Sequence, residues 1–274
     1  AVGGLRRTDV RQTGHRAVID PRAVVDPSAR LAPDVTVGPF SVIGASVEID
    51  AGTWIGPHVV IQGPTRIGRD NRIYQFSSLG EIPQDKKYAG EPTRLEIGDR
   101  NTIREFATIN RGTVQDAGLT RLGDDNWIMA YVHIAHDCVV GDRTIFANGA
   151  SLAGHVHIED DVVLGGFALV YQFTRLGMHS FCGFACGVNR DVPPYVTVAG
   201  YRAEPYGINA EGLRRRGFGD EEIQAIRRAY KVIYRANLRL EEALDKVREM
   251  TVEFPRLQIL ADFLAAPSRN GIVR

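Results

Sequence analysis

The sequence has few cysteines, no excess of charge and no long apolar run. Its three cysteines, Cys138, Cys182 and Cys186, form neither an even disulfide set nor a paired Cys-x-x-Cys zinc pattern. Lys plus Arg equals Asp plus Glu, 33 against 33, which disfavours a nucleic-acid partner. A spanning helix would need about 18 consecutive apolar residues, and residues 1–16 lack a signal-peptide core. We therefore expect a soluble, cytoplasmic protein without stable membrane insertion.

What the sequence does have is a six-residue repeat. From Ala17 an aliphatic residue stands at the third place of each hexad, from Ile19 and Val25 through to Leu79. Strands and helices have periods of 2 and 3.6, so this pattern predicts a hexapeptide solenoid, in which three hexads form one triangular coil of about 18 residues. The fold class is mainly β, a parallel β-helix. We also expect positive φ at the small residues after the core position, Gly38, Gly44, Gly56 and Gly68.

The repeat divides the chain. We predict an N-terminal extension over 1–16, a β-helix over 17–200 and a helical domain over 201–274. The register breaks near 83–93 and 113–119, which predicts loop insertions on one face. Val192-Pro193-Pro194 is expected to end the repeats. A helix over about 220–236 with Asp220 as N-cap follows a connecting stretch, and apolar stripes at 240–247 and 257–264 predict two more helices that cap the open end.

Stacking the coils predicts a site. Residues 18 positions apart should lie above one another at about the 4.8 Å strand spacing. The column two places after the core position contains His136, Gly154 and Gln172, and the next column contains Asp137, His155 and Phe173. The column just before the core position contains His133, Ser151 and Leu169. A histidine beside a carboxylate therefore lies one coil below a glycine.

These three groups suit acyl transfer. A histidine can take the proton of the nucleophile, a carboxylate can orient it, and the N–H of a glycine can approach a developing oxyanion. Nothing supplies a covalent nucleophile, because the parity of Cys138 points its side chain elsewhere. Direct transfer is favoured, with His136 as base, Asp137 as its partner and Gly154 as oxyanion donor.

Two alternatives stand beside this hypothesis. His133 and His136 with His155 could supply three imidazoles to zinc, as in the trimeric hexapeptide-repeat carbonic anhydrases. The chain could also be a structural scaffold whose histidines lie on surface turns. Stoichiometric zinc would support the first alternative, and an inert His136→Ala substitution the second.

The segments HIAHDC, ASLAGH, GEIPQDKKYAGEPTRLEIGDRN, INRGT, RDVPPYV and NAEGLRRRGF resemble the bacterial UDP-N-acetylglucosamine acyltransferases, a hexapeptide-repeat family that begins lipid A synthesis. The resemblance extends from about Val18 to Arg274. It implies a left-handed β-helix, a cytoplasmic homotrimer with sites between subunits, and transfer of an R-3-hydroxyacyl chain from acyl carrier protein to the 3-hydroxyl of UDP-N-acetylglucosamine. No metal or resident cofactor is expected, since the donor is carried on the phosphopantetheine of the carrier protein.

The resemblance also assigns roles to residues. His136 would be the base, Asp137 its partner and Gly154 the oxyanion donor. Substrate-binding positions would be Gln84, Asp85, Lys87, His133, His155, Tyr171, Gln172, Asn209, Glu211, Arg215 and Arg216. The acidic carrier protein would contact Arg227, Arg228, Lys231 and Arg235.

Three positions depart from the family pattern. Tyr171 and Asn110 stand where familiar members have histidine. Phe184 stands where long-chain members have glycine, which predicts a shorter acyl chain. Two rivals keep the fold: an enzyme acting on a 3-amino sugar nucleotide, and the later N-acyltransferase of the same pathway, which carries an additional N-terminal domain.

Overall fold

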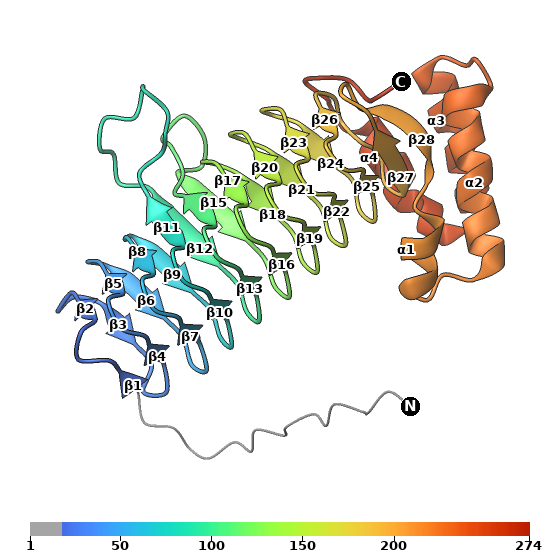
Figure 1. The fold of residues 1–274 in the computed structure, drawn as a ribbon. Coiled ribbons are helices and arrows are strands. Elements are labelled where there is room, and N and C mark those ends of the chain that lie inside the picture. The colour runs from blue at the N-terminus through green and yellow to red at the C-terminus, as the bar shows by residue number, and fades with distance from the viewer. Residues whose placement is uncertain (1–17) are drawn as a thin grey trace, which may run out of the picture.

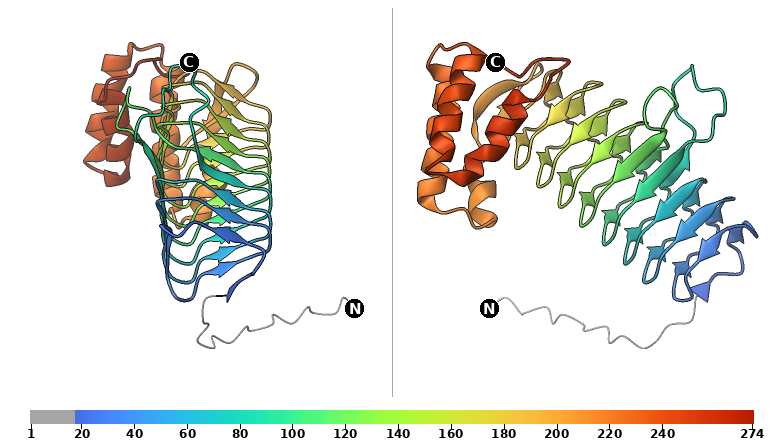
Figure 2. Two further views of the ribbon diagram at one scale, coloured as in Figure 1. Left: turned by 90° about the vertical axis from the view of Figure 1, so that its left-hand side faces the viewer. Right: turned by 180° about the vertical axis from the view of Figure 1, so that it is seen from behind.

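The hexads build a triangular prism in which each coil contributes one short strand to each of three parallel sheets. A computed structural model describes residues 18–274 (Figure 1), so the predicted extension 1–16 lies outside the described residues. The prism is a left-handed parallel β-helix, as predicted. The helices lie together at its C-terminal end (Figure 2).

The strands fall into three sheets. The first contains, in spatial order, β1 (Val18–Ile19), β4 (Thr36–Val37), β7 (Trp54–Ile55), β10 (Arg72–Ile73), β13 (Thr102–Ile103), β16 (Trp127–Ile128), β19 (Ile145–Phe146), β22 (Val163–Leu164), β25 (Phe181–Cys182), β27 (Val196–Ala199) and β28 (Glu204–Ile208). The second contains β2 (Val24–Val25), β5 (Val42–Ile43), β8 (Val60–Ile61), β11 (Ser78–Glu81), β14 (Thr108–Asn110), β17 (His133–Ile134), β20 (Ser151–Leu152), β23 (Leu169–Val170) and β26 (Gly187–Val188). The third contains β3 (Arg30–Leu31), β6 (Val47–Ile49), β9 (Thr65–Ile67), β12 (Arg94–Ile97), β15 (Leu119–Leu122), β18 (Val139–Val140), β21 (His157–Ile158) and β24 (Arg175–Leu176).

The register between coils is the one that the repeat predicts. His133 pairs with Ser151, and Ser151 pairs with Leu169, so the columns read from the sequence exist. Each third-place side chain from Val37 to Val188 points inward and is at most 3% exposed. These residues form one continuous apolar core, because stacked identical coils bury the same place of every hexad.

The glycines after the core position serve close packing of the coils, so the expectation of positive φ at these glycines was wrong. Positive φ falls two residues later, at Phe40 (60°) and His58 (56°) for Gly38 and Gly56. A Cβ on Gly38 would lie 2.7 Å from the backbone carbon of Gly56 in the next coil. The side chain is excluded by a neighbouring backbone, and the turn itself tolerates larger residues in the left-handed region.

Both insertions leave the prism at one corner, between the second and third sheets. The first connects β11 with β12 and the second connects β14 with β15 (Figure 1). On the next coil the same corner is the turn between β17 and β18, which carries His136 and Asp137. The two loops therefore overhang the predicted site.

The sheet continues beyond Val192-Pro193-Pro194, where we expected the repeats to end. Strand β27 pairs in parallel with β25, Phe181 lying opposite Thr197, and β28 then pairs antiparallel with β27. The stretch expected as a connection thus contains β28 and a short helix, α1 (Ala210–Arg215). Both prolines are buried and fit because they lie in the turn of the coil between Val192, which pairs with Leu176, and β27.

Three further helices follow, close to where the apolar stripes predicted them. They are α2 (Asp220–Arg235), α3 (Leu240–Thr251) and α4 (Gln258–Ala265), the last preceded by a 3-10 turn, η1 (Pro255–Leu257). Asp220 is the first helical residue rather than the N-cap: the cap is Gly219, whose N–H donates to the Glu222 carboxylate at 2.8 Å. Within residues 18–274 no helix is long and apolar enough to cross a bilayer.

Candidate active site

His136 and Asp137 form a hydrogen-bonded pair at the turn after β17. The Nδ1 atom of His136 lies 2.8 Å from Oδ2 of Asp137, and the Asp137 side chain is 1% exposed. Asp137 has a φ of 58°, in the left-handed region that Asp tolerates better than most residues. This backbone turn brings two sequence neighbours into side-chain contact.

The second insertion fixes the Asp137 carboxylate. The backbone N–H of Thr113 donates to Oδ1 at 2.8 Å, and its hydroxyl donates to Oδ2 at 2.6 Å. Burial alone would raise the pKa of Asp137, but the hydrogen bonds from His136 and Thr113 outweigh it and the pKa is lowered. An ionised Asp137 accepts the Nδ1–H of His136, which leaves the lone pair on Nε2 to act as a base.

Gly154 lies directly above the imidazole, as the column predicted. A Cβ on this residue would lie 2.6 Å from Cε1 and 2.8 Å from Nε2 of His136, so a side chain there would displace the ring. Among the described residues the N–H of Gly154 donates no backbone hydrogen bond. The residue that packs against the base thus has a backbone donor without a backbone partner, as an oxyanion site requires.

Two other histidines flank the pair. His155 packs edge-on against His136 with ring centroids 5.1 Å apart, stacks on Phe173 at 4.5 Å, and bonds Asp116 through Nδ1 at 2.9 Å. His133 bonds the Thr108 hydroxyl through Nδ1 at 2.8 Å. Burial, with a smaller effect of His136, lowers the pKa of His133, so its neutral form is favoured.

A cavity of about 660 Å³ opens over His136. Of the sequence-predicted residues, it gathers Gln84, Asp85, Lys87, His136, His155 and Gln172. Sequence reasoning missed Gln115, Asp116, Phe173 and Arg269, which also line it. Phe173 was in the column of Asp137 and could have been found there, whereas Arg269 comes from a segment with no periodic signal.

The other predicted residues lie elsewhere in the described chain. Tyr171 lines a separate groove with Leu169 and Tyr201, and Phe184 is 74% exposed at another corner, edge-on to Phe167. Asn209 caps α1, Glu211 pairs with Arg215 at 3.1 Å, and Arg216 pairs with Asp161 at 2.9 Å. None of these residues lines the His136 cavity of its own chain.

The zinc alternative required three converging imidazoles. Within residues 18–274 the ligand atoms that lie within 4.8 Å of one another belong to His136, Asp137 and His155, and His133 is not among them. The imidazoles of His136 and His155 each have a carboxylate partner at Nδ1. This arrangement suits an oriented base better than a three-histidine zinc site.

Cys138 is no candidate nucleophile. Its thiol is buried, donates to the carbonyl of Ala153 at 3.1 Å, and has a pKa raised to about 12 by burial. A thiolate is the reactive form of cysteine, and it is not accessible here.

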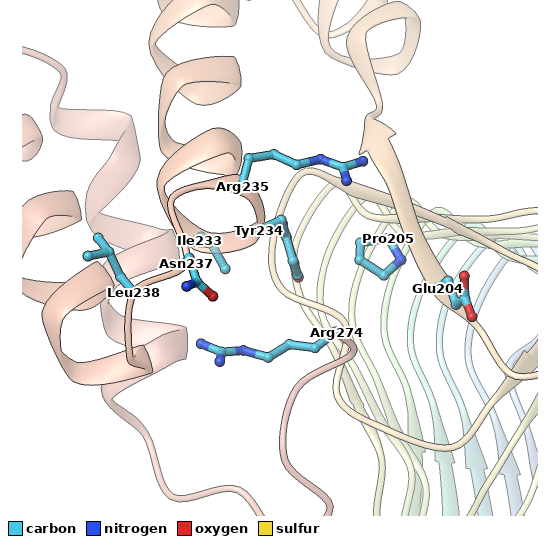
Figure 3. A pocket seen from close by; sticks show the side chains of 8 residues that line it. All are labelled: Glu204, Pro205, Ile233, Tyr234, Arg235, Asn237, Leu238 and Arg274. Atoms are coloured by element: carbon cyan, nitrogen blue, oxygen red, sulfur yellow. The ribbon is translucent and has the colours of Figure 1, made fainter.

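A second cavity, of about 330 Å³, lies between β28 and the end of α2 (Figure 3). Arg235 and Arg274 stand on either side of Tyr234, and their guanidinium groups point away from each other (Figure 3). The charges do not converge on one point, so the His136 cavity is the stronger candidate site.

Comparison with known proteins gives concordant matches. Residues 191–273 match the family described as Udp N-acetylglucosamine O-acyltransferase, domain 2, and residues 120–154 match the bacterial transferase hexapeptide. The acyl-(acyl-carrier-protein)–UDP-N-acetylglucosamine O-acyltransferase of Herminiimonas arsenicoxydans is 60% identical over 248 residues, which cover 85% of this chain and 94% of that protein.

Solved structures agree. The UDP-N-acetylglucosamine acyltransferase of Francisella novicida superposes with a TM-score of 0.92 at 44% identity and covers 94% of both chains. LpxA from Acinetobacter baumannii also reaches 0.92, at 48% identity, and covers 94% of this chain and 100% of its own.

Proposed function

The chain belongs to the UDP-N-acetylglucosamine O-acyltransferase family, and we propose that it transfers an R-3-hydroxyacyl chain from acyl carrier protein to the 3-hydroxyl of UDP-N-acetylglucosamine. This is the first step of lipid A synthesis. The observation that carries the proposal is the oriented pair of His136 and Asp137 beneath the free N–H of Gly154.

We propose direct transfer. Asp137 holds the Nδ1–H of His136, and Nε2 takes the proton of the 3-hydroxyl as its oxygen attacks the thioester carbonyl. The oxyanion of the tetrahedral intermediate accepts a hydrogen bond from Gly154, and Asp137 stabilises the imidazolium. As the carbon–sulfur bond breaks, the proton passes from Nε2 to the leaving sulfur of phosphopantetheine. These groups need no metal or resident cofactor.

The residues that lie outside the cavity motivate a homotrimer. Asn209, Glu211, Arg215, Arg216 and Tyr171 would reach the substrate from a neighbouring subunit, because they do not line the cavity of their own chain. The acyl carrier protein, which is acidic, would dock on the exposed basic residues of α2, namely Arg227, Arg228, Lys231 and Arg235. Assembly and docking would both take place in the cytoplasm.

Phe184 is proposed to limit the acyl chain. A phenyl ring that is 74% exposed fills little of its own core, so its size is free to act on a bound chain. A glycine there would leave room for a longer acyl chain at a small cost in stability, since glycine raises the entropy of the unfolded chain.

The test is a steady-state assay of the purified protein. R-3-hydroxyacyl carrier proteins of several chain lengths are supplied with UDP-N-acetylglucosamine or with its 3-amino analogue. We expect ester formation with the 3-hydroxyl acceptor and a preference for shorter chains. Turnover with neither acceptor would defeat the proposal. Turnover with the 3-amino analogue alone would show that the protein is an N-acyltransferase that forms an amide.

A further inference from the structure

The segment 266–274 returns from the helical domain to the last coils of the prism. The Asn270 side chain donates to the carbonyl of Gln172 at 3.1 Å, and Asp191 exchanges backbone hydrogen bonds with Gly271 at 2.8 Å and Val273 at 2.9 Å. Ile272 and Val273 are buried (6% and 1% exposed). Hydrogen bonds and burial together fix this segment beside β26 (Figure 1).

This attachment carries Arg269 into the His136 cavity. Its guanidinium carbon lies 3.7 Å from the centroid of the Phe173 ring, and its side chain lines the cavity. Phe173 stacks on His155, and the ring of His136 packs edge-on against His155, so Arg269 is the outer layer of a stack whose inner end contacts the base. With coils about 4.8 Å apart, the guanidinium lies roughly 10–14 Å from the base.

Some of the charged side chains that line the cavity are bonded to neighbouring side chains and others are not. Asp116 is bonded to His155, and Asp137 is bonded to His136 and Thr113. Asp85, on the first insertion, accepts the backbone N–H of Lys87. Within residues 18–274, Arg269 and Lys87 form no ion pair. Two cations thus face the cavity from opposite elements, the first insertion and the segment 266–274.

We infer that Arg269 is a substrate-binding residue that holds a phosphate group at the end of the cavity remote from His136. The inference rests on the proposed function, whose two substrates each supply such a group: the diphosphate of the nucleotide sugar and the phosphodiester of phosphopantetheine. Arginine binds phosphate through two parallel charge-assisted hydrogen bonds, and its stacking on Phe173 fixes the guanidinium plane in advance. Arg216, by contrast, is engaged with Asp161 in its own chain.

The variant Arg269→Met tests this inference, because it keeps an unbranched stem over Phe173 and removes the charge. Arg274→Met is the matched control: it removes the same charge from the same segment, but its side chain lines the second cavity (Figure 3). Steady-state assays give kcat and the two KM values, and titration with UDP alone gives a Kd without turnover. Arg269→Lys completes the series.

We expect Arg269→Met to raise one KM by about tenfold to a hundredfold, the loss typical of a hydrogen bond to a charged group. The kcat at saturation should stay within about twofold, since the contact is remote from the base. A higher KM for the nucleotide sugar with a weaker Kd for UDP identifies the diphosphate, and a higher KM for the acyl carrier protein alone identifies the phosphodiester. Arg269→Lys should recover part of the loss.

Unchanged KM values, or equal changes in Arg274→Met, would overturn the inference. This outcome is distinct from failure of the proposed function, in which the wild-type protein itself shows no turnover.

Discussion

Replacing Gly154 by alanine should abolish most activity and leave the fold intact. The new Cβ would lie 2.6 Å from Cε1 and 2.8 Å from Nε2 of His136, well inside van der Waals contact. The imidazole is a side chain and can move, whereas the coil backbone is held by the sheets on both sides. Relief of the clash therefore strains or breaks the 2.8 Å bond between Nδ1 of His136 and Asp137.

The size of the effect follows from this displacement. A shift of about 1 Å in a catalytic group costs about 10²-fold, and loss of general-base catalysis costs about 10² to 10⁴-fold. Stability should change little, because Gly154 does not have positive φ. Alanine also reduces the conformational entropy of the unfolded chain, which stabilises the folded protein by about 0.4–1 kcal/mol and offsets part of the strain.

The assay compares kcat and the thermal midpoint of wild type, Gly154→Ala and Gly207→Ala. Gly207 is the control, since no atom lies within 4 Å of a Cβ placed there. A Gly154→Ala protein with kcat within about threefold of wild type would refute the argument that Gly154 leaves room for an oriented base.

Three further predictions concern Asp137, His133 and Phe184. Asp137→Asn should lower kcat by about 10³ to 10⁴-fold, because the neutral amide no longer fixes the tautomer or stabilises the imidazolium; kinetics of the folded variant decide this. The lowered pKa of His133 means that the unfolded chain binds a proton first as the pH falls below about 6.5. The free energy of unfolding should therefore fall as the pH decreases from about 6.5 to the lower pKa of the folded state. Urea unfolding at several pH values should show a smaller fall for His133→Gln than for the wild type. Phe184→Gly should shift the preferred acyl chain to longer lengths with only a small fall in the thermal midpoint, because glycine raises the entropy of the unfolded chain. An unchanged chain profile would exclude Phe184 as the limit.

The repeat made most of the fold predictable. A period of six with an inward aliphatic at one place determines the coil and its register, and hence the stacking of Gly154 on His136. The columns follow from the period alone and do not depend on the conformation of the turns. They are therefore correct although the positive φ expected at Gly38 was wrong. Close approach between coils is a tertiary contact, and a single hexad does not reveal it.

The parts of the structure outside the repeat were harder to predict from the sequence. Strand β27 resumes the pairing after two prolines with an altered spacing, so the hexad count could not continue through it. Arg269 reaches the cavity because Asn270 and Asp191 tie down a segment far away in sequence. Asp116 lies in an insertion whose shape no period describes. Such contacts depend on how loops fold back on the prism.

We propose His136 as the general base of acyl transfer to UDP-N-acetylglucosamine. The most direct measurement is the kcat of His136→Gln, with R-3-hydroxyacyl carrier protein and UDP-N-acetylglucosamine both saturating. We expect a loss of about 10² to 10⁴-fold in a folded protein that still binds UDP-N-acetylglucosamine with wild-type affinity. A folded His136→Gln protein with kcat within about threefold of wild type would show that His136 is not the general base.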